Sequence, residues 1–198
     1  MPSATGPKLP NIILSGSPGT GKSTLSAALV SALPRLRYIN VSSEADVRGC
    51  RGEYDVELKT WEVDEKKLAL SLRKDLEQGG VLLDWIHADF LVPELDDQAH
   101  ECQEQGQDDM VDLVIQMRAD TTSLYDRYKA RGYDDTKIQE NLDCEIMDEI
   151  GDENRDAFDE AKCVVLQGTE KDKEDNVSRV LAWVKAWQTN NESGDDED

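Results

Sequence analysis

Residues 16–23, with the sequence GSPGTGKS, have the spacing G-x-x-x-x-G-K-[ST] of a phosphate-binding loop. Its glycines would let backbone N–H groups turn toward phosphate oxygens. Lys22 can reach the β- and γ-phosphates of a nucleotide, and the Ser23 hydroxyl can serve as a Mg²⁺ ligand. A merely glycine-rich turn is the alternative, but the apolar run before the motif and the helical pattern after it favour a nucleoside triphosphate site. The expected nucleotide-binding residues are Gly16, Pro18, Gly19, Thr20, Gly21, Lys22, Ser23 and Thr24.

Asp84 and His87 form the second group of candidates. Asp84 ends an apolar run, and in a parallel sheet ligands lie at the carboxyl ends of the strands, where an acid can hold Mg²⁺ through water. His87 could orient a water molecule or accept a proton near neutral pH. The alternatives are a cap or turn residue for Asp84 and a loop histidine without function for His87. We therefore predict ATP and Mg²⁺ as ligands, with Ser23 and Asp84 at the metal ion.

Arg127 and Arg131 stand four residues apart on a predicted helix that Asp120 could cap, so their side chains share one face. A guanidinium group suits phosphate oxygens and also stacks on bases. Gly132 offers a hinge for a mobile cover. The alternative is that both arginines pair with nearby aspartates on the surface.

The elements that must position these residues alternate between short apolar runs and helical patterns. Strands are predicted at residues 11–15, 38–41, 81–84, 111–115 and 162–166. Helices are predicted at 23–33, 64–78, 121–160 with an interruption at 131–133, and 175–187. This alternation indicates an α/β fold of three layers, built on a five-stranded parallel sheet covered on both faces.

Four segments fall outside this regular pattern. Residues 1–10 are predicted as an irregular lead-in, so that the domain spans 11–188. Residues 42–62 are expected to form a small loop–helix excursion. The acidic stretch at about 95–109 is interpreted as an insertion loop, and residues 189–198 as an acidic disordered tail.

The composition excludes several classes of function. The 198 residues carry 22 Lys and Arg against 43 Asp and Glu, a net charge of −21, which argues against binding duplex nucleic acid and favours a basic partner or merely high solubility. We expect no direct sequence-specific DNA binding. No apolar stretch approaches the roughly 18 residues of a membrane span, so no membrane association is expected. Four widely spaced cysteines without C-x-x-C are interpreted as free thiols in a reducing, intracellular compartment.

The phosphate-binding loop, Asp84 at a strand end and the segment 130–133 (ARGY) together resemble adenylate kinase isoenzyme 6. Members of that family are nuclear, adenylate kinase-like ATPases implicated in small ribosomal subunit assembly. The resemblance covers almost the whole chain, and the ARGY segment and residues 141–146 (NLDCEI) are its more specific pieces. It implies an adenylate-kinase-like fold with a monophosphate-binding region near 43–63 and a very short lid near 132–142.

The resemblance also implies roles for individual residues. Arg127 would stack on the adenine, and Arg131 would contact the transferring phosphates, so the expected catalytic residues are Lys22, Asp84, His87 and Arg131. Both adenylate kinase and ATPase activity are implied, with ATP, ADP and AMP as ligands. The implied partners are a basic small-subunit ribosomal protein (uS11 in the universal nomenclature) and the pre-ribosomal particle. The implied locations are the nucleus and the cytoplasm.

The chain departs from the family pattern in three places. The family has Asp-aromatic-His, whereas residues 84–87 read DWIH, so either Ile86 is inserted and His87 keeps its role, or that role is altered. Asp46 stands where the family carries an arginine, and Arg48 and Arg51 are the candidate substitutes. The insertion at 95–109 has no counterpart that we know of.

Three functions fit these observations. The first is an enzyme that passes the γ-phosphoryl group of Mg-ATP to AMP or to water in small (40S) ribosomal subunit maturation and pre-rRNA processing. The second is a nucleotide-switched assembly chaperone with little monophosphate kinase activity. The third is a generic small-molecule kinase of the shikimate or gluconate type, which fits the phosphate-binding loop equally well.

Overall fold

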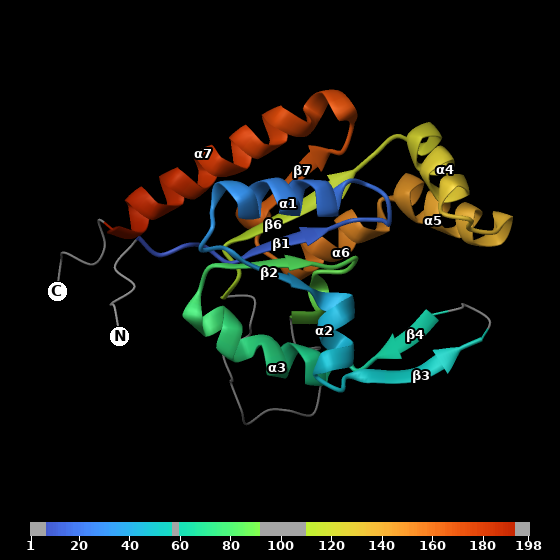
Figure 1. The fold of residues 1–198 in the computed structure, drawn as a ribbon, viewed down its shortest axis with the longest axis horizontal. Helices are drawn as coiled ribbons and strands as arrows, with labels where there is room; N and C mark the ends of the chain where they lie inside the picture. Colours follow the sequence, from blue (N-terminus) through green and yellow to red (C-terminus); the bar gives the residue numbers. More distant parts are fainter. Residues whose placement is uncertain (1–6, 57–59, 92–109, 193–198) are drawn as a thin grey trace.

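A five-stranded parallel sheet forms the centre of the computed structural model, which describes residues 7–56, 60–91 and 110–192 (Figure 1). The strand order is β2-β5-β1-β6-β7. The strands are β1 (Ile12–Ser15), β2 (Arg37–Asn40), β5 (Val81–Asp84), β6 (Leu113–Arg118) and β7 (Cys163–Gln167). All four neighbouring pairs are parallel, which confirms the predicted α/β fold with a five-stranded parallel sheet.

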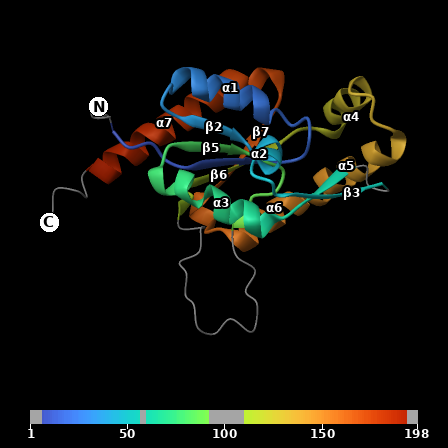
Figure 2. The same ribbon diagram turned by 60° about the horizontal axis from the view of Figure 1, so that its bottom comes forward.

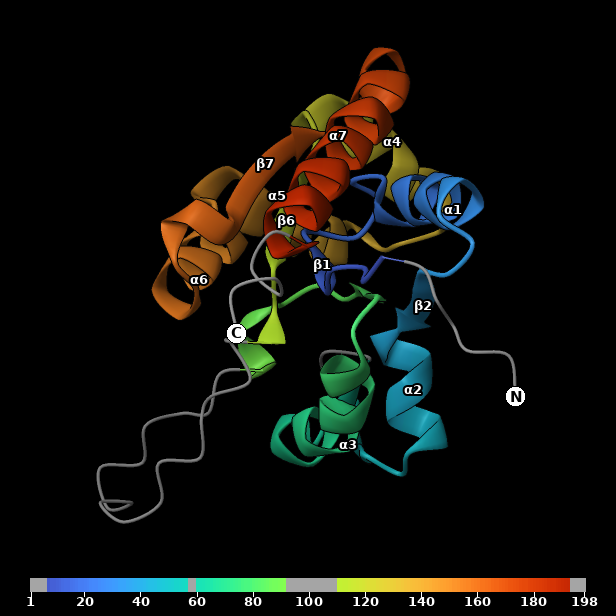
Figure 3. The ribbon, with the colours of Figure 1, turned by 90° about the vertical axis from the view of Figure 1, so that its left-hand side faces the viewer.

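Helices cover both faces of this sheet. On one face α1 (Lys22–Ala32) and α7 (Lys173–Glu192) lie side by side (Figure 3), and their apolar side chains pack with Ile12 and Leu14 of β1. On the other face α3 (Glu65–Gln78) lies near α6 (Glu149–Ala157) (Figure 2), and Leu68, Leu72 and Leu76 of α3 pack with Ile13. Because successive residues of a strand point to opposite faces, β1 is buried on both sides and contributes to both cores.

The boundaries of two predicted strands were wrong by a few residues. The segment predicted at 38–41 is strand only to Asn40, because the Asn40 side chain accepts a hydrogen bond from Ser43 N and starts α2 (Val41–Val47). The segment predicted at 111–115 lies instead at Leu113–Arg118, and the chain before it is held by Asn11, whose carbonyl accepts from the N–H groups of residues 112 and 113.

The interpretation of residues 42–62 as a loop–helix excursion was wrong in its second half. The helix exists as α2, but β3 (Arg51–Asp55) and β4 (Thr60–Val63) follow it and pair as an antiparallel hairpin. Tyr54 and Trp61 face each other across this pair with ring centroids 5.1 Å apart. Such an aromatic cross-strand contact stabilises a two-stranded ribbon that has little core of its own.

The helical region predicted from 121 to 160 has the expected break after α4 (Thr121–Ala130), where Gly132 adopts a positive φ of 74°. A second break, which we did not predict, separates α5 (Asp135–Met147) from α6 at Asp148, whose φ is 58°. Helices α4 and α5 pack on each other through a small core of their own and project from the end of the sheet (Figure 1). The predicted lid region at 132–142 therefore comprises the α4–α5 turn and the first half of α5.

The C-terminal helix is longer than predicted. Helix α7 runs to Glu192, so residues 189–192, assigned to a disordered tail, are helical, and Gln188 anchors this end by donating to the carbonyl of Lys8. Within the predicted lead-in, Leu9 is buried against the core. The acidic insertion at 95–109 and residues 193–198 lie outside the described residues.

Two further observations concern the cysteines and the helices. Cys50, Cys144 and Cys163 are free thiols. Across the described ranges, none of the helices combines the length and the apolar character needed to cross a bilayer.

Candidate nucleotide-binding site

The loop between β1 and α1 has the backbone of a phosphate cradle. Gly16, Gly19 and Gly21 all have positive φ angles, of 128°, 85° and 106°, which residues with a side chain rarely adopt. Helix α1 begins directly after Gly21, so its unpaired N–H groups point toward the space above the loop. The predicted motif therefore has the local structure that its chemistry requires.

A pocket of about 860 Å³ lies over this loop at the carboxyl edge of the sheet. Leaving aside the two arginines, eight of the residues predicted to bind the nucleotide or act in catalysis line this pocket: Pro18, Gly19, Gly21, Lys22, Ser23, Thr24, Asp84 and His87. Arg127 of α4 and Arg131, which directly follows α4, also line it. The remaining two, Gly16 and Thr20, belong to the loop's support, because Gly16 N donates to Ile86 O and the buried Thr20 hydroxyl donates to Ser17 O.

Lys22 lies within the loop rather than on the surface. Its ammonium Nζ donates to the carbonyl oxygens of Gly16 and Ser17, the second at 3.0 Å. Burial lowers the pKa of Lys22 to about 8, against the opposing attraction of Asp84, and Arg131 lowers it further. The group is thus a poorly solvated cation that phosphate oxygens can stabilise.

Asp84 and Ser23 bring two oxygen donors together at the pocket. Ser23 Oγ lies 3.5 Å from Asp84 Oδ2, and Asp84 itself is buried at the end of β5. The hydroxyl of Tyr38, on the neighbouring strand β2, donates to the same Oδ2 at 2.9 Å and orients the carboxylate. Hydroxyl and carboxylate oxygens this close together are donors that suit Mg²⁺, so the residues fit the predicted metal site.

Asp84→Asn is expected to lower Mg²⁺-dependent nucleotide turnover about 10²- to 10³-fold, because the amide keeps the shape of the side chain but loses the charge that holds the ion. Turnover measured over a series of Mg²⁺ concentrations checks this. Asp75→Asn is the matched control, since Asp75 is also a paired aspartate but contacts Arg37 and Arg48 outside the pocket. Unchanged turnover in Asp84→Asn would remove Asp84 from the site.

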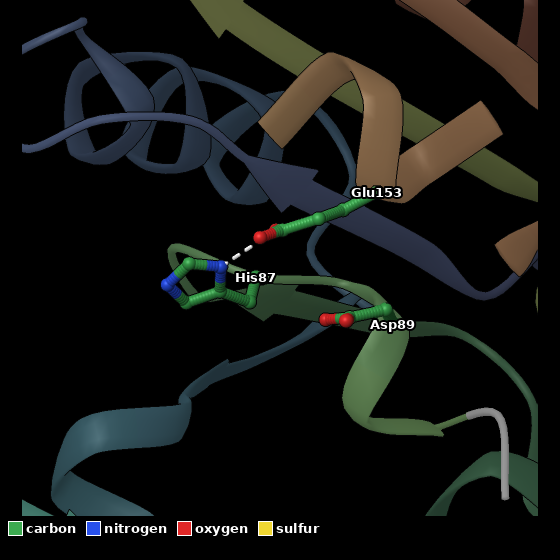
Figure 4. Close-up of side chains that lie close together, drawn as sticks. All are labelled: His87, Asp89 and Glu153. Atoms are coloured by element: carbon green, nitrogen blue, oxygen red, sulfur yellow. Dashed lines mark hydrogen bonds and ion pairs between the residues drawn. The ribbon is translucent and has the colours of Figure 1, made fainter. Parts of the chain in front are cut away.

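His87 lies at the pocket wall despite the extra residue in the DWIH segment. Trp85 N donates to Leu14 O and Ile86 O accepts from Gly16 N, so both residues stay bonded to β1 and the loop before the chain turns to His87. Nδ1 of His87 lies 2.7 Å from Glu153 Oε2 on α6 (Figure 4). The structure thus places the histidine in the same pocket as Asp84 and gives it a partner that the sequence did not suggest.

Arg127 on α4 and Arg131, the residue directly after this helix, both line the pocket, and Asp120 caps the start of α4 by accepting from Ser123 N, as predicted. The Arg127 guanidinium donates to the carbonyls of Gly19, at 2.6 Å, and of Gly168, at 3.2 Å. It thereby joins the phosphate-binding loop to the turn after β7.

The two candidate substitutes for the family's arginine differ in position. Arg51 lines the pocket, pairs with Asp46 and lies over the ring of Trp61, 4.8 Å from its centroid. Arg48 instead binds Glu44 and Asp75 outside the pocket. Of the two, Arg51 is therefore the residue that can reach a ligand of this pocket.

A buried carboxylate ties the loop to the lid helix. Glu145 of α5 is only 6% exposed, and it accepts hydrogen bonds from Ser17 Oγ at 2.7 Å, from Arg118 Nε at 3.2 Å and from Ala119 N at 3.2 Å. Glu145 belongs to the NLDCEI segment, which marks the family but carries no chemical signal by itself. Sequence reasoning therefore missed its role.

Three more residues of the site escaped prediction. Tyr38 and Trp61 resemble ordinary strand residues, and only the sheet pairing brings Tyr38 to Asp84. Gly168 passes so close to the loop that a Cβ atom there would lie 1.6 Å from Thr20 O. In the sequence Gly168 is a single glycine after an apolar run, and this is the only signal that could have indicated its place in the site.

The strand order, the loop and the acid at the neighbouring strand end define a nucleotide-binding protein of the P-loop kinase fold. A family model described as "AAA domain" matches residues 12–148. A solved structure of shikimate kinase from Acinetobacter baumannii is 16% identical, covers 90% of this chain and 94% of its own, and superposes with a TM-score of 0.58. The YorR protein of Bacillus subtilis, solved with phosphorylated GDP, is 17% identical over 88% of this chain and 95% of its own, with a TM-score of 0.57.

Sequence relatives narrow the assignment. The adenylate kinase isoenzyme 6 homolog HBR1 of Candida albicans is 40% identical over 89% of this chain and 69% of its own length. The homolog FAP7 of Saccharomyces cerevisiae is 38% identical over 90% of this chain and 83% of its own. The chain therefore belongs to the adenylate kinase isoenzyme 6 family, as its motifs indicated.

Proposed function

We propose that this protein is an Mg-ATP-dependent, adenylate kinase-like NTPase that transfers the γ-phosphoryl group of ATP to AMP, to water, or to both. The observation that carries this proposal is one pocket whose lining brings together Lys22, Ser23 and Asp84 with Arg127 and Arg131. Phosphoryl transfer depends mainly on positioning and on stabilising charge, and these side chains supply both.

Each residue has a defined part in this reaction. Lys22 and the loop N–H groups would bind the phosphates, and Arg131 would stabilise the charge that develops on the transferring group. Ser23 and Asp84 would hold Mg²⁺, which neutralises phosphate charge when bound. His87 would receive or orient the proton of the attacking water.

One arrangement favours the second candidate, a nucleotide-switched assembly chaperone with little monophosphate kinase activity. Asp46, at the position where the family carries an arginine, forms an ion pair with Arg51. That pair reduces the positive charge available to a monophosphate at this end of the pocket. Hydrolysis needs no second phosphate site, so the pairing supports water as an acceptor.

Product analysis separates these functions. The protein is incubated with Mg-ATP alone and with each nucleoside monophosphate, and ADP and inorganic phosphate are both quantified. ADP in excess of phosphate that appears only with AMP is the result expected of an adenylate kinase. Equal ADP and phosphate without an acceptor is the result expected of an ATPase. Absence of turnover under every condition would refute the proposed enzyme and leave nucleotide binding alone.

We further propose that the protein serves small-subunit ribosome maturation in the nucleus and cytoplasm through the basic ribosomal protein uS11. The net charge of −21 supports a basic partner. Affinity for purified uS11, measured at low and at high salt and with ATP or ADP present, tests this. We expect binding that weakens steeply with salt and differs between the two nucleotides. Binding that is insensitive to salt would contradict the electrostatic basis of the partnership.

A further inference from the structure

His87 is a residue of the pocket lining, and its ring contacts the carboxylate of Glu153, which does not line the pocket. The 2.7 Å between His87 Nδ1 and Glu153 Oε2 is a hydrogen-bond distance, made between residues 66 positions apart in the chain. Figure 4 shows the carboxylate on one side of the ring and the second ring nitrogen, Nε2, on the side away from it. His87 and Asp84 both belong to the lining of this pocket.

Helix α6 holds Glu153 in place. The next residue, Asn154, is 2% exposed and donates from its side-chain amide to Ser15 Oγ at 2.8 Å, which ties α6 to the end of β1. Ile150 on the same helix and Phe158 directly after it are also buried. The carboxylate therefore comes from a fixed element that contacts the strand leading into the phosphate-binding loop.

A neutral imidazole carries its proton on one nitrogen and a lone pair on the other. A carboxylate can only accept, so its hydrogen bond to Nδ1 requires the proton to be there. Nε2 then carries the lone pair. That is the nitrogen on the side away from Glu153, where it is able to take a proton from a water molecule.

We propose that Glu153 is a positioning residue that fixes the Nδ1–H tautomer and the orientation of His87, so that Nε2 acts as the proton acceptor in ATP hydrolysis. This inference rests on the proposed function. In the step, the water oxygen bonds to the γ-phosphorus, one water proton moves to Nε2, and the bond from the γ-phosphorus to the β–γ bridging oxygen breaks. The bridging oxygen keeps the electron pair and leaves with ADP.

A metal ion is the competing explanation of this cluster. Asp89 adds a second carboxylate, and the donor atoms of His87, Asp89 and Glu153 all lie within 4.8 Å of one another. A direct hydrogen bond already joins two of the three, and an ion between them would have to replace it. The contact observed therefore favours the hydrogen-bonded pair.

Nuclear magnetic resonance of the imidazole nitrogens tests the tautomer directly. The chain has two histidines, so a His100→Gln variant assigns the two rings. At about pH 9 we expect the Nδ1–H form for His87 in the wild type and in Glu153→Gln, whose amide oxygen still accepts. Glu153→Ala should shift the ring toward the Nε2–H form, and Asp89→Asn, the matched control, should not.

Steady-state kinetics supply the functional half of the test. We expect kcat for ATP hydrolysis to fall about 10- to 100-fold in Glu153→Ala, with KM for Mg-ATP unchanged and with most of kcat retained in Glu153→Gln. Equal melting temperatures exclude unfolding as the cause. The tautomer is measured without turnover, so failure of this proposal is distinguishable from failure of the proposed function.

Three results would overturn the inference. The first is an Nε2–H tautomer in the wild type. The second is a His87 spectrum and kcat that do not change in Glu153→Ala. The third is a stoichiometric shift of the His87 nitrogen resonances on addition of Zn²⁺ that Asp89→Asn abolishes, which would assign the cluster to a metal ion instead.

Discussion

Lys22→Ala is expected to lower nucleotide turnover at least about 10³-fold while leaving the protein folded. The ammonium is the only cation that the phosphate-binding motif itself supplies, and charge stabilisation supplies most of the catalysis in phosphoryl transfer. The fold should tolerate the change. Burial already lowers the pKa of Lys22 to about 8, which means that the folded protein holds this cation at a cost. Turnover by product analysis and melting temperature by circular dichroism check the two halves of the prediction.

Lys67→Ala is the matched control for this experiment. Lys67 also donates from Nζ to a backbone carbonyl, that of Gly49, but it lies on α3 and is not part of the pocket lining. Its loss should leave turnover within about twofold of the wild type. Wild-type turnover in Lys22→Ala would contradict the catalytic role of the loop. Equal losses in both variants would show that the assay responds to surface lysines in general.

Much of the fold could be predicted because its signals are local. A short apolar run ending in GSPGTGKS specifies a strand, a turn and a helix within 22 residues, and the observed β1 and α1 match it closely. The run Val81–Asp84 was predicted with its observed boundaries. The β3–β4 hairpin was missed because its first strand reads RGEYD, is exposed along most of its length and has no alternating apolar face.

The supporting residues of the site could not be predicted for a different physical reason. Tyr38, Glu145 and Glu153 act through partners that lie 46, 128 and 66 positions away in the chain. Their residue types are common on helices and strands, so neither type nor spacing distinguishes them. Only the parallel register of the sheet and the packing of α5 and α6 bring them to these partners. The candidate binding and catalytic residues can therefore be predicted from motifs, whereas the residues that orient them are identified only from the tertiary structure.

Glu145→Ala is expected to destabilise the protein by about 3–5 kcal/mol, because it removes a buried carboxylate that accepts hydrogen bonds from three partners. These partners are Ser17 of the loop and Arg118 and Ala119 at the end of β6. For a chain of this size the loss corresponds to a fall in melting temperature of about 6–20 °C. Chemical denaturation followed by circular dichroism gives the free energy of unfolding directly.

The same substitution should also weaken nucleotide binding, because Ser17 Oγ donates to Glu145 from within the loop, while the carbonyl of Ser17 accepts from Lys22. Without its contact to α5 the loop is less ordered before the nucleotide binds. Ordering the loop then reduces the net free energy of nucleotide binding. Glu140→Ala, an exposed glutamate of the same helix, is the matched control and should change stability by less than about 0.5 kcal/mol. If Glu145→Ala unfolded at the same denaturant concentration as Glu140→Ala, the buried carboxylate would not be what joins the lid helix to the loop. A loss of stability with unchanged ATP affinity would limit its role to the fold.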